Sequence, residues 1–184
     1  PDARAAHYFQ EVVGARGEVR QHACSNYDGE HDFYVPPVEW ITELGTLYDR
    51  SNEHPDLHWR PTGKVRVRRV DGMGLEPHIV KIDAELADIK VLHGMTGLLK
   101  RRVPRVIIFE LVTQADGYTT DADLVDWLAG YGYEVLVPHR ISGLAEDHFI
   151  APFAGLLSNN SMAVERSYLP LVFSENNARD WRLP

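Results

Sequence analysis

Residues 78–112 read HIVKIDAELADIKVLHGMTGLLKRRVPRVIIFELV, and this stretch decides the fold class. His78 to Asp83 is a short apolar run of strand length, and Val106 to Val112 is a second, strongly apolar strand. Between them, Ala84 to Arg102 carries apolar residues at helical spacing, which predicts a helix. The order strand, helix, strand is typical of a mostly parallel sheet covered by helices, so the stretch predicts an α/β protein.

The same alternation continues toward the carboxyl end. Residues 121–130 are predicted to form a helix and residues 133–137 a strand. Because crossovers of this kind are right-handed, we expect the three strands to be parallel neighbours, with Leu92 and Leu99 buried against them. A last apolar run, Tyr168 to Phe173, follows a long loop and is expected to add a closing edge strand.

The amino-terminal half has a different pattern. Residues 3–13 place apolar side chains on one face of a helix. Glu18 to Ala23 and His31 to Val35 are predicted strands of a hairpin or meander. Four prolines interrupt residues 36–63, which predicts a long loop or insertion. Lys64 to Val70 alternates apolar and basic residues, as a half-exposed strand does.

Composition narrows the class of protein. The 184 residues suffice for one well-buried domain, so we expect a single domain over residues 1–184, with residues 139–184 as an extension. No apolar run approaches the roughly 20 residues of a membrane helix. The net charge of −8 argues against a nucleic-acid partner. A lone cysteine, Cys24, fits a reducing compartment, so a soluble, cytoplasmic protein is expected.

Acidic residues stand at the ends of the apolar strands, where ligands of open α/β sheets bind. Asp83 ends the first strand and is followed by Glu85, Glu110 ends the second, and His139 follows the strand that runs from Tyr133 to Pro138. Crowded carboxylates serve as a general base or as metal ligands, but acids at this position also cap the following helix. Both roles remain open for Asp83, and we favour the cap for Glu85.

Several short stretches together resemble one known family. In chain order they are ACSNYDG at 23–29, VRRVD at 67–71, KIDAELAD at 81–88, VLHG at 91–94, PRVIIFE at 104–110 and GYEV at 132–135. These stretches resemble the signature of FkbM-type methyltransferases, in the family's order and at its spacing, and the similarity covers residues 1–138. The resemblance implies a Rossmann-like methyltransferase fold, a three-layer sandwich around a mostly parallel sheet.

The sequence departs from the family pattern in two ways. Leu86 stands in place of the motif glycine and Asp88 in place of its second glutamate, which puts in doubt any role that needs close backbone approach. The family also has a first strand with a glycine-rich loop, then a second strand followed by an acid and a proline, and Pro1 resembles that proline. Those two strands lie between the family's third and fourth strands. We therefore expect upstream residues, another chain or a rearranged sheet to fill the gap.

The resemblance also implies an activity: methyl transfer from S-adenosylmethionine to a hydroxyl oxygen, often of a sugar or natural product. The sulfonium is already reactive, so the protein chiefly aligns the small-molecule acceptor and removes its proton. Asp83 is expected to act as the base or as ligand of a divalent ion, with His139 as an alternative base and Glu85 and Glu110 as further candidates. The residues expected to contact the cofactor are Ala23, Ser25, Asn26 and Asp83.

Rival interpretations remain. A noncatalytic remnant or interaction domain would keep the fold without binding cofactor, and the missing glycines favour it. A metal-dependent hydrolase lacks a ligand series in this sequence. His54 and His58 are four residues apart but have no third ligand. Trp40, Tyr48 and Trp59 are expected to form an acceptor wall or to pack as a satellite cluster.

Overall fold

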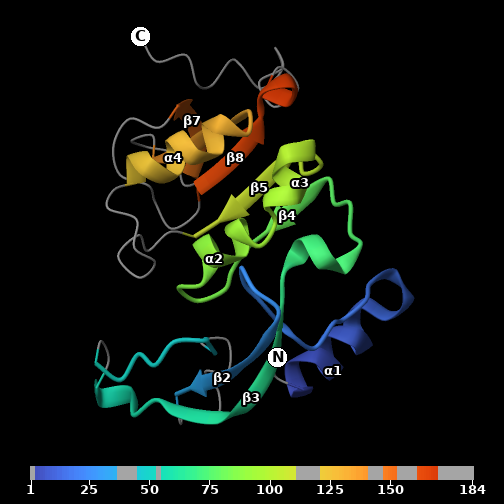
Figure 1. The fold of residues 1–184 in the computed structure, drawn as a ribbon, viewed down its shortest axis with the longest axis vertical. Helices are drawn as coiled ribbons and strands as arrows, with labels where there is room; N and C mark the ends of the chain where they lie inside the picture. The colour runs from blue at the N-terminus through green and yellow to red at the C-terminus, as the bar shows by residue number, and fades with distance from the viewer. Residues whose placement is uncertain are drawn as a thin grey trace. The chain divides into compact units, whose positions relative to one another are not determined.

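The chain divides into two compact units. Figure 1 labels the helices and strands of both. The structure is a computed structural model that describes residues 3–36, 45–52, 55–110, 121–140, 147–152 and 161–169. The first unit comprises Pro1–Gly74 and Ala84–Met95, and the second comprises Leu75–Asp83 and Thr96–Pro184. Each unit contains helices and a sheet of its own, which confirms the predicted class of a protein with both α-helices and β-strands.

The first unit is built on a three-stranded sheet. Its strands are β1 (Ala23–Cys24), β2 (Gly29–Val35) and β3 (Arg60–Arg68), in the order β1-β3-β2. β1 pairs with β3 in parallel, and β2 pairs with β3 antiparallel. Phe33 of β2 and Val67 of β3 are buried with Leu47, so the inward faces of the two long strands form the core of this unit.

This sheet differs from the predicted hairpin or meander, because β3 lies between β1 and β2. The strand predicted from Glu18 to Ala23 is reduced to the two residues of β1, and β3 begins at Arg60, inside the predicted loop 36–63. The Asp28 carboxylate contacts the end of β3: it accepts hydrogen bonds from the Arg69 backbone N–H at 3.1 Å and from Arg69 Nε at 3.0 Å. These bonds lower the pKa of Asp28 and tie the β1–β2 connection to the end of β3.

Helix α1 (Ala3–Val13) confirms the predicted amphipathic helix, but its apolar face is uncovered in the part of the chain that the structure describes. Tyr8, Phe9 and Val12 are 69%, 49% and 60% exposed. The 3-10 turn Gly14–Arg16 follows the helix, and Gly14 has a φ of 57°, a conformation that glycine adopts without steric cost. The helix is therefore set by its local pattern and not by burial.

The second unit contains a five-stranded sheet. Its strands are β4 (Ile79–Lys81), β5 (Val106–Phe109), β6 (Tyr133–Arg140), β7 (Asp147–Pro152) and β8 (Ser161–Glu165), in the order β4-β5-β8-β6-β7. β4 and β5 are parallel, whereas β8 is antiparallel to both of its neighbours and β7 is antiparallel to β6. Four of the five residues of β8 are buried, as befits a central strand.

The position of β8 corrects the predicted sheet. β5 and β6 run in the same direction, as predicted, but β8 separates them, so they are not neighbours. Two of the six strand pairings among the described residues are parallel, so the sheets are mixed and not mostly parallel. The predicted closing strand at 168–173 is wrong at its start, because Arg166–Tyr168 is a 3-10 turn; residues 170–173 lie outside the described ones.

The long helix predicted from Ala84 to Arg102 is wrong. Two short helices, α2 (Asp88–His93) and α3 (Thr96–Arg101), take its place. The residues before α2 cannot be helical, because Glu85 and Leu86 have φ angles of 44° and 77° in the left-handed region. The chain therefore makes a turn where the apolar periodicity alone predicted a first helical turn.

Gly94 marks the end of α2 at a close backbone approach. A Cβ atom at this position would lie 2.0 Å from the carbonyl oxygen of Ser25, so only glycine fits there without a shift. Leu92 and Leu99 are both fully buried, as predicted, but Leu92 belongs to the first unit and Leu99 to the second, so they do not share the one sheet that was predicted to cover them. The apolar pattern thus identified Leu92 and Leu99 as buried although the helix is broken, whereas Leu86 is only partly buried.

Helix α4 (Asp121–Gly130) has the predicted bounds and packs against β6. Leu124 and Leu128 on this helix are fully buried. None of the helices among the described residues is long and apolar enough to cross a membrane.

Candidate functional site

Two of the predicted acids reach the same edge of the second unit's sheet. Asp83 lies just beyond β4 and Glu110 just beyond β5, and in this parallel pair Lys81 is opposite Ile108. The Ile82 N–H donates to the Ile108 carbonyl at 2.8 Å, which continues the pairing past the end of β4. The same register puts Asp83 level with Glu110, at the carboxyl edge where open sheets bind ligands.

The Asp83 carboxylate is at the surface. Its side chain is 55% exposed, and Oδ2 forms an ion pair with Lys81 Nζ at 3.5 Å. Of the two roles left open by the sequence, the helix cap is wrong: α2 begins at Asp88, with Ala87 as its N-cap residue and no side-chain cap. Asp83 is therefore available for proton transfer or ligand binding.

Glu85 is held by contacts that differ from the predicted helix cap. Its Oε2 accepts a hydrogen bond from Arg50 Nη1 at 3.4 Å, within an ion pair whose two side chains are mostly buried. The Glu85 carbonyl oxygen accepts from Thr46 Oγ1 at 2.6 Å. The left-handed φ of Glu85 keeps it out of α2, which explains why it cannot cap that helix. Thr46 and Arg50 were not predicted, since they are 39 and 35 residues away along the chain.

His139 lies within β6, opposite His148 of β7, and not after the end of a strand as predicted. Its strand continues through Arg140, which moves the strand end beyond the expected position. β8 lies between this strand and β5, the strand that Glu110 follows. The sheet order therefore does not bring His139 next to the acidic edge.

The sequence left open a divalent ion at Asp83 and gave His54 and His58 no third ligand. Among the described residues, no group of three or more His, Cys, Asp and Glu side chains could hold a metal ion. His58 is described, with a φ of 44°, whereas His54 lies outside the described residues. A divalent ion at Asp83 stays a prediction.

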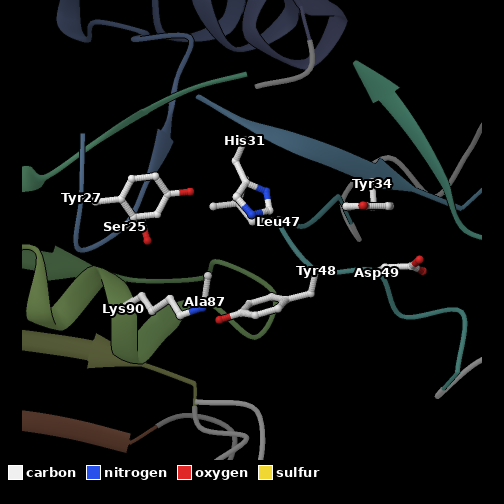
Figure 2. Close-up of a pocket in the computed structure, with 9 residues that line it drawn as sticks. All are labelled: Ser25, Tyr27, His31, Tyr34, Leu47, Tyr48, Asp49, Ala87 and Lys90. Carbon is white, nitrogen blue, oxygen red and sulfur yellow. The ribbon is translucent and has the colours of Figure 1, made fainter. Parts of the chain in front are cut away.

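The first unit contains a pocket of about 190 Å³, shown in Figure 2. Aromatic rings form much of its wall, namely those of Tyr27, His31, Tyr34 and Tyr48. The other lining residues are Ser25, Leu47, Asp49, Ala87 and Lys90. Sites for drug-sized ligands are larger, at roughly 300–1,000 Å³, so this pocket accommodates one ring-sized group.

The pocket offers groups of both charges. Lys90 Nζ lies 4.4 Å from the centroid of the Tyr48 ring, and Figure 2 shows the two side chains together at the wall. Hydrogen bonds from the side chain and backbone of Ser51 lower the pKa of Asp49, which keeps this carboxylate ionised at neutral pH. Burial raises the pKa of Tyr27, which remains a neutral phenol that can donate or accept a hydrogen bond.

Of the predicted cofactor residues in the first unit, Ser25 is the one that lines this pocket. Ser25 is fully buried, its N–H donates to the Arg68 carbonyl at 3.1 Å, and its hydroxyl donates to Asn26 Oδ1 at 3.4 Å. Ala23 pairs with Val67 inside the sheet. Of the three aromatic residues expected to form an acceptor wall or a satellite cluster, Tyr48 lines the pocket, the buried Trp59 packs beneath Arg50, and Trp40 lies outside the described residues.

The comparison with protein families agrees with the motif stretches. Residues 9–135, more than half of the chain, match the methyltransferase FkbM domain. This span contains the pocket and both acids of the sheet edge. No curated protein and no solved structure gives a significant match. The resemblance of the sequence stretches is therefore confirmed, and the chain belongs to the FkbM methyltransferase family.

Proposed function

We propose that the protein transfers the methyl group of S-adenosylmethionine to a hydroxyl oxygen of a sugar or natural product. Membership of the FkbM family supports methyl transfer in general. The observation that carries the finer proposal is the pocket of the first unit, where the buried Ser25 lines a cavity of about 190 Å³. The adenine base of the donor, a fused pair of rings, is small enough for this volume, and the remainder of the cofactor would extend beyond the cavity.

The wall of the pocket suits an adenine ring. Tyr27 and Tyr48 provide aromatic surfaces on which a planar base can pack. The Lys90 ammonium can donate a hydrogen bond to a ring nitrogen, and the Asp49 carboxylate and the Ser25 hydroxyl oxygen can accept hydrogen bonds from the exocyclic amine. These residues would therefore hold the base by packing and by hydrogen bonds of both directions.

Asp83 is the proposed general base. When bound, S-adenosylmethionine supplies a methyl group already activated on a sulfonium. As the new bond from the acceptor oxygen to the methyl carbon forms, the carbon–sulfur bond breaks and the hydroxyl proton has to leave. We propose that the exposed Asp83 carboxylate, which ends the β4 side of the acidic edge, takes that proton, and Glu110 is the second acid of the edge. An ion held by these acids is an alternative role for the same carboxylates.

Calorimetry on the full-length protein tests the donor. We expect S-adenosylmethionine and S-adenosylhomocysteine both to bind, and tritiated methyl groups to pass to members of a panel of sugars and hydroxylated natural products. Prior treatment with EDTA separates the base from the metal role, because only the metal role loses turnover on chelation. A protein that is folded but binds neither cofactor form would reject the proposal and favour the noncatalytic interaction domain.

A further inference from the structure

Two successive residues other than glycine lie in the left-handed region in the turn before α2. The φ angles of Glu85 and Leu86 are 44° and 77°. L-residues other than glycine disfavour this region, because the Cβ atom crowds the following carbonyl oxygen. Contacts from elsewhere in the unit must therefore stabilise the turn.

The first such contact comes from Thr46. Its hydroxyl donates to the Glu85 carbonyl oxygen at 2.6 Å and accepts from the Tyr48 N–H at 3.3 Å. Thr46 is 1% exposed and exchanges two backbone hydrogen bonds with Tyr34 of β2, at 2.9 and 3.0 Å. The hydroxyl thus connects the turn to the sheet of the first unit.

The second contact comes from Arg50. Its guanidinium lies 3.4 Å from the Glu85 carboxylate and 5.4 Å from the ring centroid of Trp59, which is 7% exposed. On the other side of the turn, the buried Asp88 carboxylate accepts from the Ala84 N–H at 3.2 Å. The turn is therefore fixed through its backbone and through the Glu85 side chain.

These contacts join two segments that both contribute to the pocket wall. Leu47, Tyr48 and Asp49 lie between Thr46 and Arg50 in the chain and line the pocket. Ala87 and Lys90, which also line it, follow directly after the turn. Thr46, Arg50 and Glu85 do not themselves line the pocket, and we call the Thr46 and Arg50 contacts with the turn the clamp.

We propose that Thr46 and Arg50 are positioning residues: they hold the Glu85–Leu86 turn and so keep the pocket in its binding shape although leucine replaces the motif glycine. The inference rests on the proposed cofactor role of the pocket. Without the clamp, the turn would leave its left-handed conformation for part of the time. Apparent affinity then falls in proportion to the fraction of molecules that remain competent to bind.

Calorimetry of the full-length protein with S-adenosylhomocysteine tests the clamp. Thr46→Val keeps the shape and removes the hydroxyl, and Kd should rise by about five- to tenfold, the scale of one hydrogen bond. Arg50→Met should act in the same direction, and Thr46→Ser should restore affinity. The matched controls are Thr62→Val, which removes a hydroxyl bonded to the Phe33 carbonyl at 3.1 Å, and Arg20→Met, which breaks the ion pair with Glu18. Both should change Kd by less than about twofold.

The substitution Leu86→Gly distinguishes positioning from general stabilisation. Glycine adopts the left-handed region without steric cost, so the effect of Thr46→Val on Kd should shrink to about twofold or less in that background. Should Thr46→Val alone fail to fold, recovery of folding by added Leu86→Gly supports the clamp, and failure to recover refutes it. Equal effects of Thr46→Val with leucine and with glycine at position 86 would overturn the inference. A folded parent protein that binds no S-adenosylhomocysteine would instead reject the proposed function, and the clamp's role in cofactor binding with it.

Discussion

Replacing Arg105 should destabilise the second unit, because it leaves a buried carboxylate with too few partners. Glu165 ends the central strand β8, and its side chain is 2% exposed. Arg105 Nη1 lies 3.2 Å from Glu165 Oε2, Arg102 Nη1 lies 3.9 Å from Oε1, and Ser167 donates to the carboxylate from its backbone and side chain. Burial by itself would raise the pKa of Glu165, but hydrogen bonds from Ser167 and the two arginine charges together lower it.

The expected magnitude follows from this geometry. Removing one partner of a buried ion pair costs about 3–5 kcal/mol. The Arg105 side chain is 39% exposed, and Arg102 and Ser167 remain, so Arg105→Met should lower the free energy of unfolding by about 2 kcal/mol. For a chain of this size, that corresponds to a fall of roughly 4–8 °C in the unfolding midpoint.

Urea unfolding of Arg105→Met, Glu165→Gln and the double variant measures the pair directly. Because folding lowers the pKa of Glu165, its contribution is complete above the unfolded value of 4.5 and is lost as pH falls through the folded value. The cost of Arg105→Met should therefore be present at pH 7 and shrink at pH 3. A cost below about 0.5 kcal/mol at pH 7, or an equal cost at both pH values, would refute the reasoning.

Three further predictions concern single positions. Asp83→Asn should lower the rate of methyl transfer by roughly 100-fold or more, the usual scale for a lost acid–base group. Glu110→Gln should lower it less, and Asp126→Asn, at an exposed position, is the control that should leave it unchanged. Unchanged turnover in Asp83→Asn would refute Asp83 as the base. Gly94→Ala should lower the free energy of unfolding of the first unit by about 1–3 kcal/mol, because its Cβ would lie 2.0 Å from the Ser25 carbonyl oxygen. An unchanged midpoint of urea unfolding would contradict that contact. Burial raises the pKa of Tyr133 to about 12, so this phenol should not ionise below pH ~11. The ultraviolet phenolate titration of Tyr133→Phe should therefore match that of the parent protein below this pH. If the variant instead loses absorbance change near pH 10, Tyr133 is not buried.

Local elements of the fold could be predicted from the sequence, whereas the strand order could not. Helices α1 and α4 and strands β5 and β6 follow from apolar periodicity, which is a local property. The position of β8 depends on pairing with β5 and β6 across long separations, and no local pattern in SMAVE at 161–165 specifies it. The break in the predicted long helix was equally hidden, because Leu86 is a good helix former that here has a φ of 77°.

The sequence likewise predicts one part of the candidate site and not the other. Asp83 and Glu110 were predicted to share a sheet edge, since each ends an apolar strand, and the parallel register of β4 and β5 confirms it. The pocket could be predicted only at Ser25 and Tyr48. Its remaining residues come from segments that are distant in sequence, and the contacts that join them, such as Thr46 to Glu85, are tertiary.

The central place of β8 has a consequence for synthesis on the ribosome. β5 pairs with β8 from Val106↔Val164 to Phe109↔Ser161, so the partner of an apolar strand emerges about fifty residues after it. At roughly 5–20 residues per second, translation leaves that edge of β5 without its native partner for some seconds. Exposed apolar edges of this kind are templates for pairing with other chains. Nascent chains stalled between these two strands should therefore recruit chaperones, and release beyond Glu165 should end that dependence.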